Sequence, residues 1–278
     1  MRPRQKQLIY AGLTAILILI WIFYSADDLQ TTAVLAGTVR AATLLALGAM
    51  CGMIGERSGV VNIGIEGQFL LSAFAAFTIA SMTGSLFMGT LAGVGMGLIM
   101  GWLLAAMAVG LKVDQIIAGT VLNISALGLT SFFYDRSRSL GIGKYTNIDL
   151  GPLAELPLVG TVLFSRPPLT YLTMVLLVVV HIALFRSVWG MRTRAIGEHP
   201  GAADTVGIDV LKLRYFNVTI AGGLAGFGGS YLALEAVGTF SRAMSGGRGF
   251  LALAVMIFGR RTPFGAYAAA LFFGFTTA

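Results

Sequence analysis

A chain of 278 residues with 56% hydrophobic and only 11% charged residues falls well short of the roughly 25% charged residues of a typical soluble domain. Several apolar runs approach the about 20 residues with which a helix crosses a hydrocarbon core of ~30 Å, so the composition predicts a polytopic protein in a lipid bilayer. The net charge of +7 gives no reason to expect a nucleic-acid partner, because the basic residues lie mostly between apolar runs, as the positive-inside bias predicts.

The apolar runs predict an all-α bundle. The first, residues 8–24, follows a basic N-terminus and lacks a convincing cleavage site, so we expect a retained helix rather than a signal peptide. Further spans are expected at residues 31–54, in a segment ending near residue 82, and at 86–111, 115–134, 169–185, 214–234 and 264–278, whereas the apolar run at 249–259 is short for a full crossing. These runs predict about 8–10 membrane segments in a single transmembrane domain over residues 1–278.

Two of these runs have notable features. Glycines at four-residue intervals in the 86–111 run predict a smooth helical face against a neighbouring helix; they are Gly89, Gly93, Gly97 and Gly101. The last run is apolar up to Ala278. Because a bare C-terminus inside an apolar helix is costly, we expect a chain shortened at this end.

A polar stretch at residues 55–71 interrupts the apolar pattern. Its first part holds Glu56 and Arg57 and is expected near the inner mouth of the protein. Its second part, residues 60–67, predicts a broken or re-entrant start of the next helix, because irregular backbone at membrane depth is tolerated only where it lines a cavity or is covered by protein.

Polar side chains at membrane depth are the candidates for a substrate path. They are Asn62, Glu66, Asn123 and Asn217. An asparagine amide offers both donors and an acceptor, which suits a ribose or the edge of a nucleobase. Hydrogen bonding between helices is the alternative role for each of them, worth about 0.6 kcal/mol on average.

The distribution of basic residues predicts the orientation. With the N-terminus inside, twelve Lys and Arg residues fall on the cytoplasmic side and six on the outer side. This places the loop of residues 135–168 outside and the polar segment of residues 190–213 in the cytoplasm.

The cytoplasmic segment contains a predicted short helix. Pro200 at its start and Gly207 after its end bracket fewer than two turns. Ala202, Ala203 and Val206 would give it one small apolar face, and Asp209 is the expected N-cap of the following helix. A helix this short is marginal in water, so it needs either its own neighbours or a partner protein to pack against.

The sequence gives no indication of enzymatic activity. It contains no P-loop, no G-x-S-x-G and no H-E-x-x-H motif. His181 and His199 have no partners at metal-ligand spacing, and Cys51 stands alone in an apolar run. We therefore expect no catalytic residue, no metal and no cofactor in this chain.

Three stretches together resemble the permease subunits of bacterial ABC importers of the ribose-permease superfamily. They are residues 55–71, residues 194–209, and residues 246–254 followed by Phe258-Gly259-Arg260. The chain is most similar to the branch for nucleosides and simple sugars that works with basic-membrane-protein-type lipoproteins. The resemblance covers the chain from about residue 31 onward and implies the bacterial plasma membrane as its location.

The resemblance also implies partners. A second permease subunit would pair with this one, an external lipoprotein would deliver the substrate, and a separate cytoplasmic ATPase would bind ATP and Mg²⁺. The short helix would then be the coupling helix that inserts into the ATPase, and the residues implied in that contact are Glu198, His199, Ala202, Ala203, Asp204 and Gly207.

An ion-coupled secondary transporter of a small polar solute is the alternative. It would need a charged relay inside the bundle, where Glu66 is the one carboxylate that we place with conviction. A weak internal similarity is also present, because residues 67–73 and 249–254 both begin helices after a glycine-rich polar run. Transporters built from repeats often place such paired broken helices at the substrate site.

Overall fold

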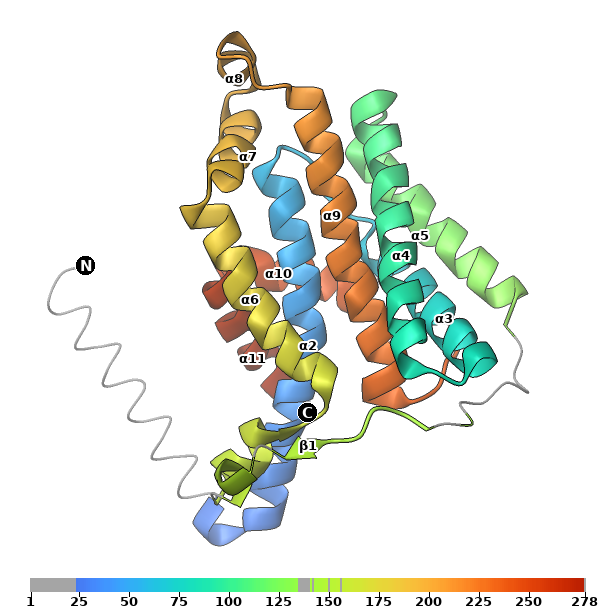
Figure 1. The fold of residues 1–278 in the computed structure, drawn as a ribbon, viewed down its shortest axis with the longest axis vertical. Coiled ribbons are helices and arrows are strands. Elements are labelled where there is room, and N and C mark those ends of the chain that lie inside the picture. Colours follow the sequence, from blue (N-terminus) through green and yellow to red (C-terminus); the bar gives the residue numbers. More distant parts are fainter. Residues whose placement is uncertain (1–23, 135–140, 142, 150, 156, 278) are drawn as a thin grey trace, which may run out of the picture.

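The computed structural model describes residues 24–277 except residues 135–140, 142, 150 and 156, and it confirms the all-α membrane bundle (Figure 1). Within that part of the chain, six helices are long and apolar enough to cross a membrane. Five are α2 (Asp28–Arg57), α3 (Ile65–Thr83), α5 (Gln115–Phe132), α6 (Pro168–Arg186) and α4 (Leu86–Ala105), which continues as the π-helix η1 (Ala106–Gly110). The sixth is α9 (Val210–Tyr231), which continues as the π-helix η4 (Leu232–Val237).

The described part of the chain also holds four shorter helices: α7 (Val188–Glu198), α8 (Pro200–Thr205), α10 (Arg248–Phe258) and α11 (Pro263–Thr277). The predicted count of about 8–10 segments included the runs that form α10 and α11, which have 11 and 15 residues. It also included residues 8–24, of which residues 8–23 lie outside the described part of the chain.

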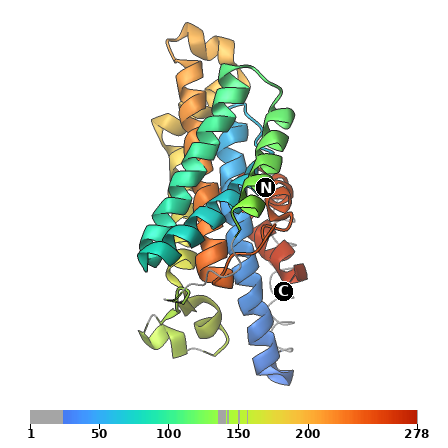
Figure 2. The same ribbon diagram turned by 90° about the vertical axis from the view of Figure 1, so that its right-hand side faces the viewer.

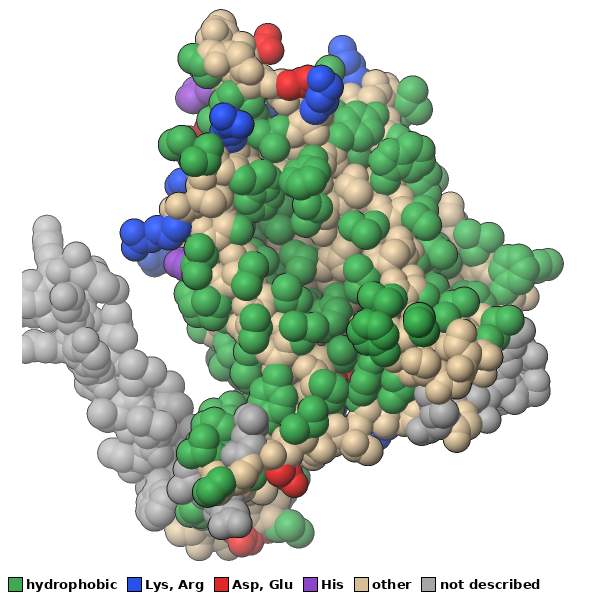
Figure 3. All heavy atoms as spheres, viewed as in Figure 1, with side chains coloured by type: hydrophobic (Ala, Val, Ile, Leu, Met, Phe, Trp, Pro, Cys, Tyr) green, Lys and Arg blue, Asp and Glu red, His purple; other side chains and the backbone are tan. Residues whose placement is uncertain are grey.

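The two ends of the bundle differ (Figures 1 and 2). One end carries α7 and α8, and the opposite end carries a small lobe formed by the strands β1 (Ile148–Asp149) and β2 (Ser165–Arg166) with the single turns η2 (Gly151–Glu155) and η3 (Gly160–Phe164). Hydrophobic side chains cover the middle of the face in Figure 3, while many of the charged side chains gather toward the α8 end. This arrangement is that of a bilayer-spanning protein whose predicted inner and outer segments lie at opposite ends.

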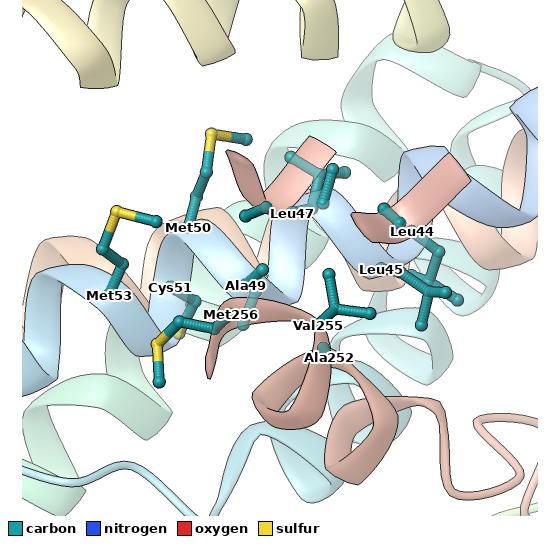
Figure 4. Packing of buried hydrophobic residues seen from close by; sticks show 14 of the residues in the cluster. Leu44, Leu45, Leu47, Ala49, Met50, Cys51, Met53, Ala252, Val255 and Met256 are labelled. Atoms are coloured by element: carbon teal, nitrogen blue, oxygen red, sulfur yellow. The ribbon is translucent and has the colours of Figure 1, made fainter. Parts of the chain in front are cut away.

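Close helix contacts build the core. The predicted glycine face of α4 lies against α9, where a Cβ on Gly97 would stand only 2.3 Å from the Gly222 carbonyl oxygen. On the other side of the bundle, α2 packs against α10 through a cluster of aliphatic and methionine side chains (Figure 4). A Cβ on Gly48 of α2 would lie 2.6 Å from the Ala252 Cβ of α10, so this contact also depends on a missing side chain.

Three local features differ from the sequence-based expectations or add to them. Residues 188–198, which include the start of the polar segment of residues 190–213, form α7. Of the predicted apolar face on the short helix, Ala203 is buried within the chain, whereas Ala202 is exposed and Val206 is 75% exposed. Glu235 directly follows the predicted span of residues 214–234, where a loop is expected, but it lies in η4 with only 4% of its surface exposed.

Candidate functional site

The backbone between α2 and α3 is the irregular feature around which the site is built. The chain is not helical from Ser58 to Gly64, as the glycine-rich polar stretch predicts. Gly59 adopts a positive φ of 83°, which few other residues tolerate, and α3 then begins at Ile65. Irregular backbone inside a membrane protein leaves N–H and C=O groups that need partners from elsewhere in the molecule.

Amide side chains supply several of those partners. Asn62 is buried, and its Oδ1 accepts a hydrogen bond from the Gly64 N–H at 2.9 Å. The Asn123 Nδ2 on α5 donates to the Ile63 carbonyl at 3.1 Å, and its Oδ1 accepts from the Gly67 N–H at 2.7 Å. At the first residue of α5, the Gln115 Oε1 accepts from the Val61 N–H at 2.6 Å. These bonds fix the irregular segment against α5.

Glu66 joins the start of α3 to the start of α10. Its Oε1 accepts from the Gly247 N–H and its Oε2 from the Gly249 N–H, both at 2.7 Å. The N-cap of α10 is Gly247, which has no side chain to perform this capping itself. A glycine is required at position 249 for α10 to approach α3 this closely, because a Cβ on Gly249 would lie 2.4 Å from the Glu66 backbone nitrogen. The two helices with a similar glycine-rich start therefore meet at one carboxylate.

A cavity of about 270 Å³ opens beside this junction. Three elements line it: α3, α5 and the loop that leads into α10. The lining residues are Glu66, Gly67, Leu70, Asn123, Ile124, Leu127, Ala243, Ser245, Gly246 and Gly247. The volume lies just below the ~300 Å³ at which typical ligand pockets begin.

The structure thus brings together two of the four predicted substrate-path residues, Glu66 and Asn123. Asn62 lies behind the cavity, where its Nδ2 donates to the Gln68 Oε1 at 3.0 Å and lies 3.4 Å from the Cys51 Sγ. Asn217 faces α7 instead, since its Oδ1 accepts from the Trp189 indole N–H at 2.9 Å. The Nδ2 of the same amide donates to the Thr193 hydroxyl at 3.1 Å.

The predicted coupling residues gather around α8. Pro200 occupies the first position of the helix, and Gly207 follows it with a φ of 81°, so the predicted bracket is confirmed. Of the six residues implied in ATPase contact, Ala203 is buried and the others are exposed; these are Glu198, His199, Ala202, Asp204 and Gly207. An open hollow of about 660 Å³ lies between α8 and the start of α9.

Asp209 is the N-cap of α9, as predicted. Its Oδ1 accepts from the Lys212 N–H at 3.0 Å, and its Oδ2 lies 2.9 Å from the Lys212 ammonium. The backbone N–H of Lys212, followed by its side chain, lowers the pKa of Asp209 below its ordinary value. Both side chains are at least half exposed, so the ion pair itself contributes little to stability.

Arg214 connects the α8 end to the irregular segment. Its Nε donates to the Ser58 carbonyl at 2.9 Å, and its NH2 group donates to the Ile196 carbonyl of α7 at 3.1 Å. Gly197 packs directly on the same turn, because a Cβ there would lie 2.2 Å from the Arg57 carbonyl oxygen. The helix α7 is therefore in close contact with the chain that leads to the cavity.

Several of these residues were missed by sequence reasoning. Gln68 lies within the polar stretch of residues 55–71 and Gln115 is the first residue of a predicted span, so both polar side chains could have been considered as partners of the irregular backbone. Arg214 is predicted only as the first residue of a span on the cytoplasmic side, and Glu235 only as part of the loop that follows that span. The Glu235 carboxylate accepts from the Leu169 and Thr170 N–H groups at 2.8 and 3.1 Å and thereby caps α6. Nothing in the neighbouring sequence marks that long-range contact.

Comparison of the sequence with known proteins places this chain among transporter permeases. The model of a family described as the permease component of branched-chain amino acid transport systems matches residues 34–278. No solved structure gave a significant match.

Individual relatives match over most of their length. A guanosine ABC transporter permease of Bacillus subtilis is 35% identical over 87% of this chain and 80% of that protein. A nucleoside ABC transporter permease of Lactococcus lactis is 37% identical over 81% of this chain and 75% of that protein. A Haloferax volcanii protein provisionally named a glucose ABC transporter permease is 36% identical, over 86% and 74%.

Proposed function

We propose that this chain, which belongs to the family of branched-chain amino acid transport system permease components, forms the translocation path for a nucleoside or a simple sugar in an ABC importer. The single observation that carries the substrate class is the cavity between α3, α5 and the start of α10. It combines acceptor groups on Glu66 and Asn123 with apolar walls, which is the combination that a hydroxylated ring or a base requires. The guanosine and nucleoside permeases among the relatives support the same class.

We propose a partner for each end of the molecule. The exposed α8 would insert into a cytoplasmic ATPase that binds ATP and Mg²⁺, so this chain would be a non-catalytic subunit without a cofactor of its own. The opposite end would receive substrate from an extracytoplasmic lipoprotein, and a second permease subunit would complete the path. We further propose that the chain lies in a bacterial plasma membrane with its N-terminus in the cytoplasm, which the distribution of Lys and Arg supports.

An ion-coupled secondary transporter fits the geometry less well. Such a protein would use an intramembrane carboxylate as a relay, and Glu66 is the carboxylate at the cavity. Both of its oxygens already accept hydrogen bonds from the start of α10. The relatives named as ABC transporter permeases likewise favour ATP-driven transport.

Uptake into proteoliposomes that hold the complete importer tests the energy source and the substrate. We expect vanadate to abolish guanosine uptake and a protonophore to leave it unchanged. Uptake that stops with the protonophore and continues with vanadate would refute the assignment. Co-purification of an ATPase subunit with a tagged copy of this chain gives an independent check.

The role of α8 is tested by adding charge at its two alanines. We expect Ala202→Arg to abolish uptake while ATP hydrolysis continues, because its side chain is exposed on the helix. Ala203→Arg should have the same effect and should also loosen α8, because Ala203 is 3% exposed. Val113→Arg, in the exposed turn before α5, is the control. Normal uptake in the Ala202→Arg importer would remove α8 from the ATPase interface.

A further inference from the structure

We propose that Glu66, in the first turn of α3, acts as an internal anion that occupies the start of α10, and that it thereby restricts the cavity to uncharged solutes rich in hydrogen-bond donors. The proposal rests on the function proposed above and names the feature that selects the substrate class. It excludes phosphorylated nucleosides and sugars, as well as solutes that carry a free carboxylate.

The starting point is the polarity of the junction. A helix start presents free N–H groups and the positive end of the helix dipole, so it attracts anions. Both helices here begin after a glycine, Gly64 for α3 and Gly247 for α10, and neither glycine forms a side-chain cap. At α3 the side chains of Asn62 and Asn123 accept from the Gly64 and Gly67 N–H groups instead. At α10, the N–H groups of Gly247 and Gly249 would be free to bind a small anion if no other acceptor were present.

Glu66 fills that role from within the chain. It lies in the first turn of α3, and its two oxygens accept hydrogen bonds from the N–H groups of Gly247 and Gly249 at 2.7 Å each. Two short bonds from N–H donors to the two oxygens are the pattern of an ionised carboxylate. The donors at the start of α10 are therefore occupied before any solute arrives.

What remains for a solute is mainly acceptor capacity and apolar surface. The oxygens of Glu66 retain lone pairs, and the Asn123 amide is engaged by the Gly67 N–H and the Ile63 carbonyl. Leu70, Ile124 and Leu127 supply apolar walls. A hydroxyl or a base N–H can donate to the carboxylate, whereas a phosphate would meet a like charge at short range.

Removal of the carboxylate should convert the site into an anion site. We expect the thermal midpoint of purified Glu66→Ala complex to fall, and sodium formate to raise it again because formate can accept from Gly247 and Gly249. A formate Kd of about 10 mM would shift the folding equilibrium about tenfold at 100 mM formate. Inorganic phosphate should act similarly. Wild-type complex should show no such response beyond that of sodium chloride at equal ionic strength.

Two further variants keep the test decisive. Asn123→Ala changes the same cavity without removing the carboxylate, so its midpoint should not respond to formate. Glu66→Gln keeps the side-chain shape, and guanosine 5′-monophosphate should stabilise this variant but not the wild-type complex. A formate response that is equal in Glu66→Ala and wild type, or no response to the monophosphate in Glu66→Gln, would overturn the proposal.

This readout is independent of transport. Failure of the wild-type importer to take up guanosine would count against the proposed function, while the anion response of the Glu66 variants would still report on the junction. Normal guanosine uptake without an anion response would count against the inference alone.

Discussion

Replacement of Gly97 by alanine tests the crossing of α4 and α9. The Cβ of an alanine at this position would lie 2.3 Å from the Gly222 carbonyl oxygen and 2.4 Å from the Gly226 Cα. These are backbone atoms, so no side-chain rotation can relieve the overlap. Ordinary contact begins at 3.4 Å, and the two helices would therefore have to separate by roughly 1 Å.

The expected loss of stability follows from that displacement. Overpacking of a well-packed core costs about 1–3 kcal/mol. The intrinsic preference of alanine over glycine in a helix returns up to ~1 kcal/mol. We therefore expect Gly97→Ala to lower the free energy of unfolding by about 1–2 kcal/mol. The separation of the two helices also weakens dispersion contacts along the whole crossing.

Gly95 offers a matched control two residues away on the same helix. A Cβ there meets nothing within 4 Å, so Gly95→Ala should leave stability unchanged or raise it slightly. Both variants can be compared by thermal melting of the detergent-purified complex, with the monodisperse fraction as readout. If Gly97→Ala melts at or above the temperature of Gly95→Ala, the close crossing of α4 and α9 is refuted.

Two further predictions concern polar contacts between helices. Glu235→Ala should destabilise the protein by about 1–3 kcal/mol for each buried N–H group that it leaves without an acceptor, whereas Glu235→Gln should lose less because it retains one acceptor. Equal melting of both variants and wild type would exclude the cap on α6. Asn217→Ala should cost about 0.6–1.7 kcal/mol of stability by removing the bonds to Trp189 and Thr193. Guanosine uptake per folded importer should remain unchanged, and a selective loss of affinity would instead return Asn217 to the substrate path.

The sequence by itself determined the features that depend on neighbouring residues. The length and spacing of the apolar runs identified the long helices, and the glycine spacing in α4 identified its contact face. Pro200 and Gly207 marked α8, and Asp209 marked the start of α9. Each of these signals arises within a few turns of one helix, where spacing along the chain translates directly into position on a surface.

Tertiary structure alone decided where the polar side chains find their partners. Glu66 binds the start of α10 across a separation of 181 residues, and Glu235 caps α6 from 66 residues away. The groups that they bind are backbone N–H groups, which almost every residue carries, so no residue type marks the partner in the sequence. Which N–H groups each carboxylate reaches depends on how its helix is rotated about its own axis when it packs in the bundle. For that reason the stretch of residues 55–71 was recognisable as a broken helix start, while its junction with α10 became visible only in the folded bundle.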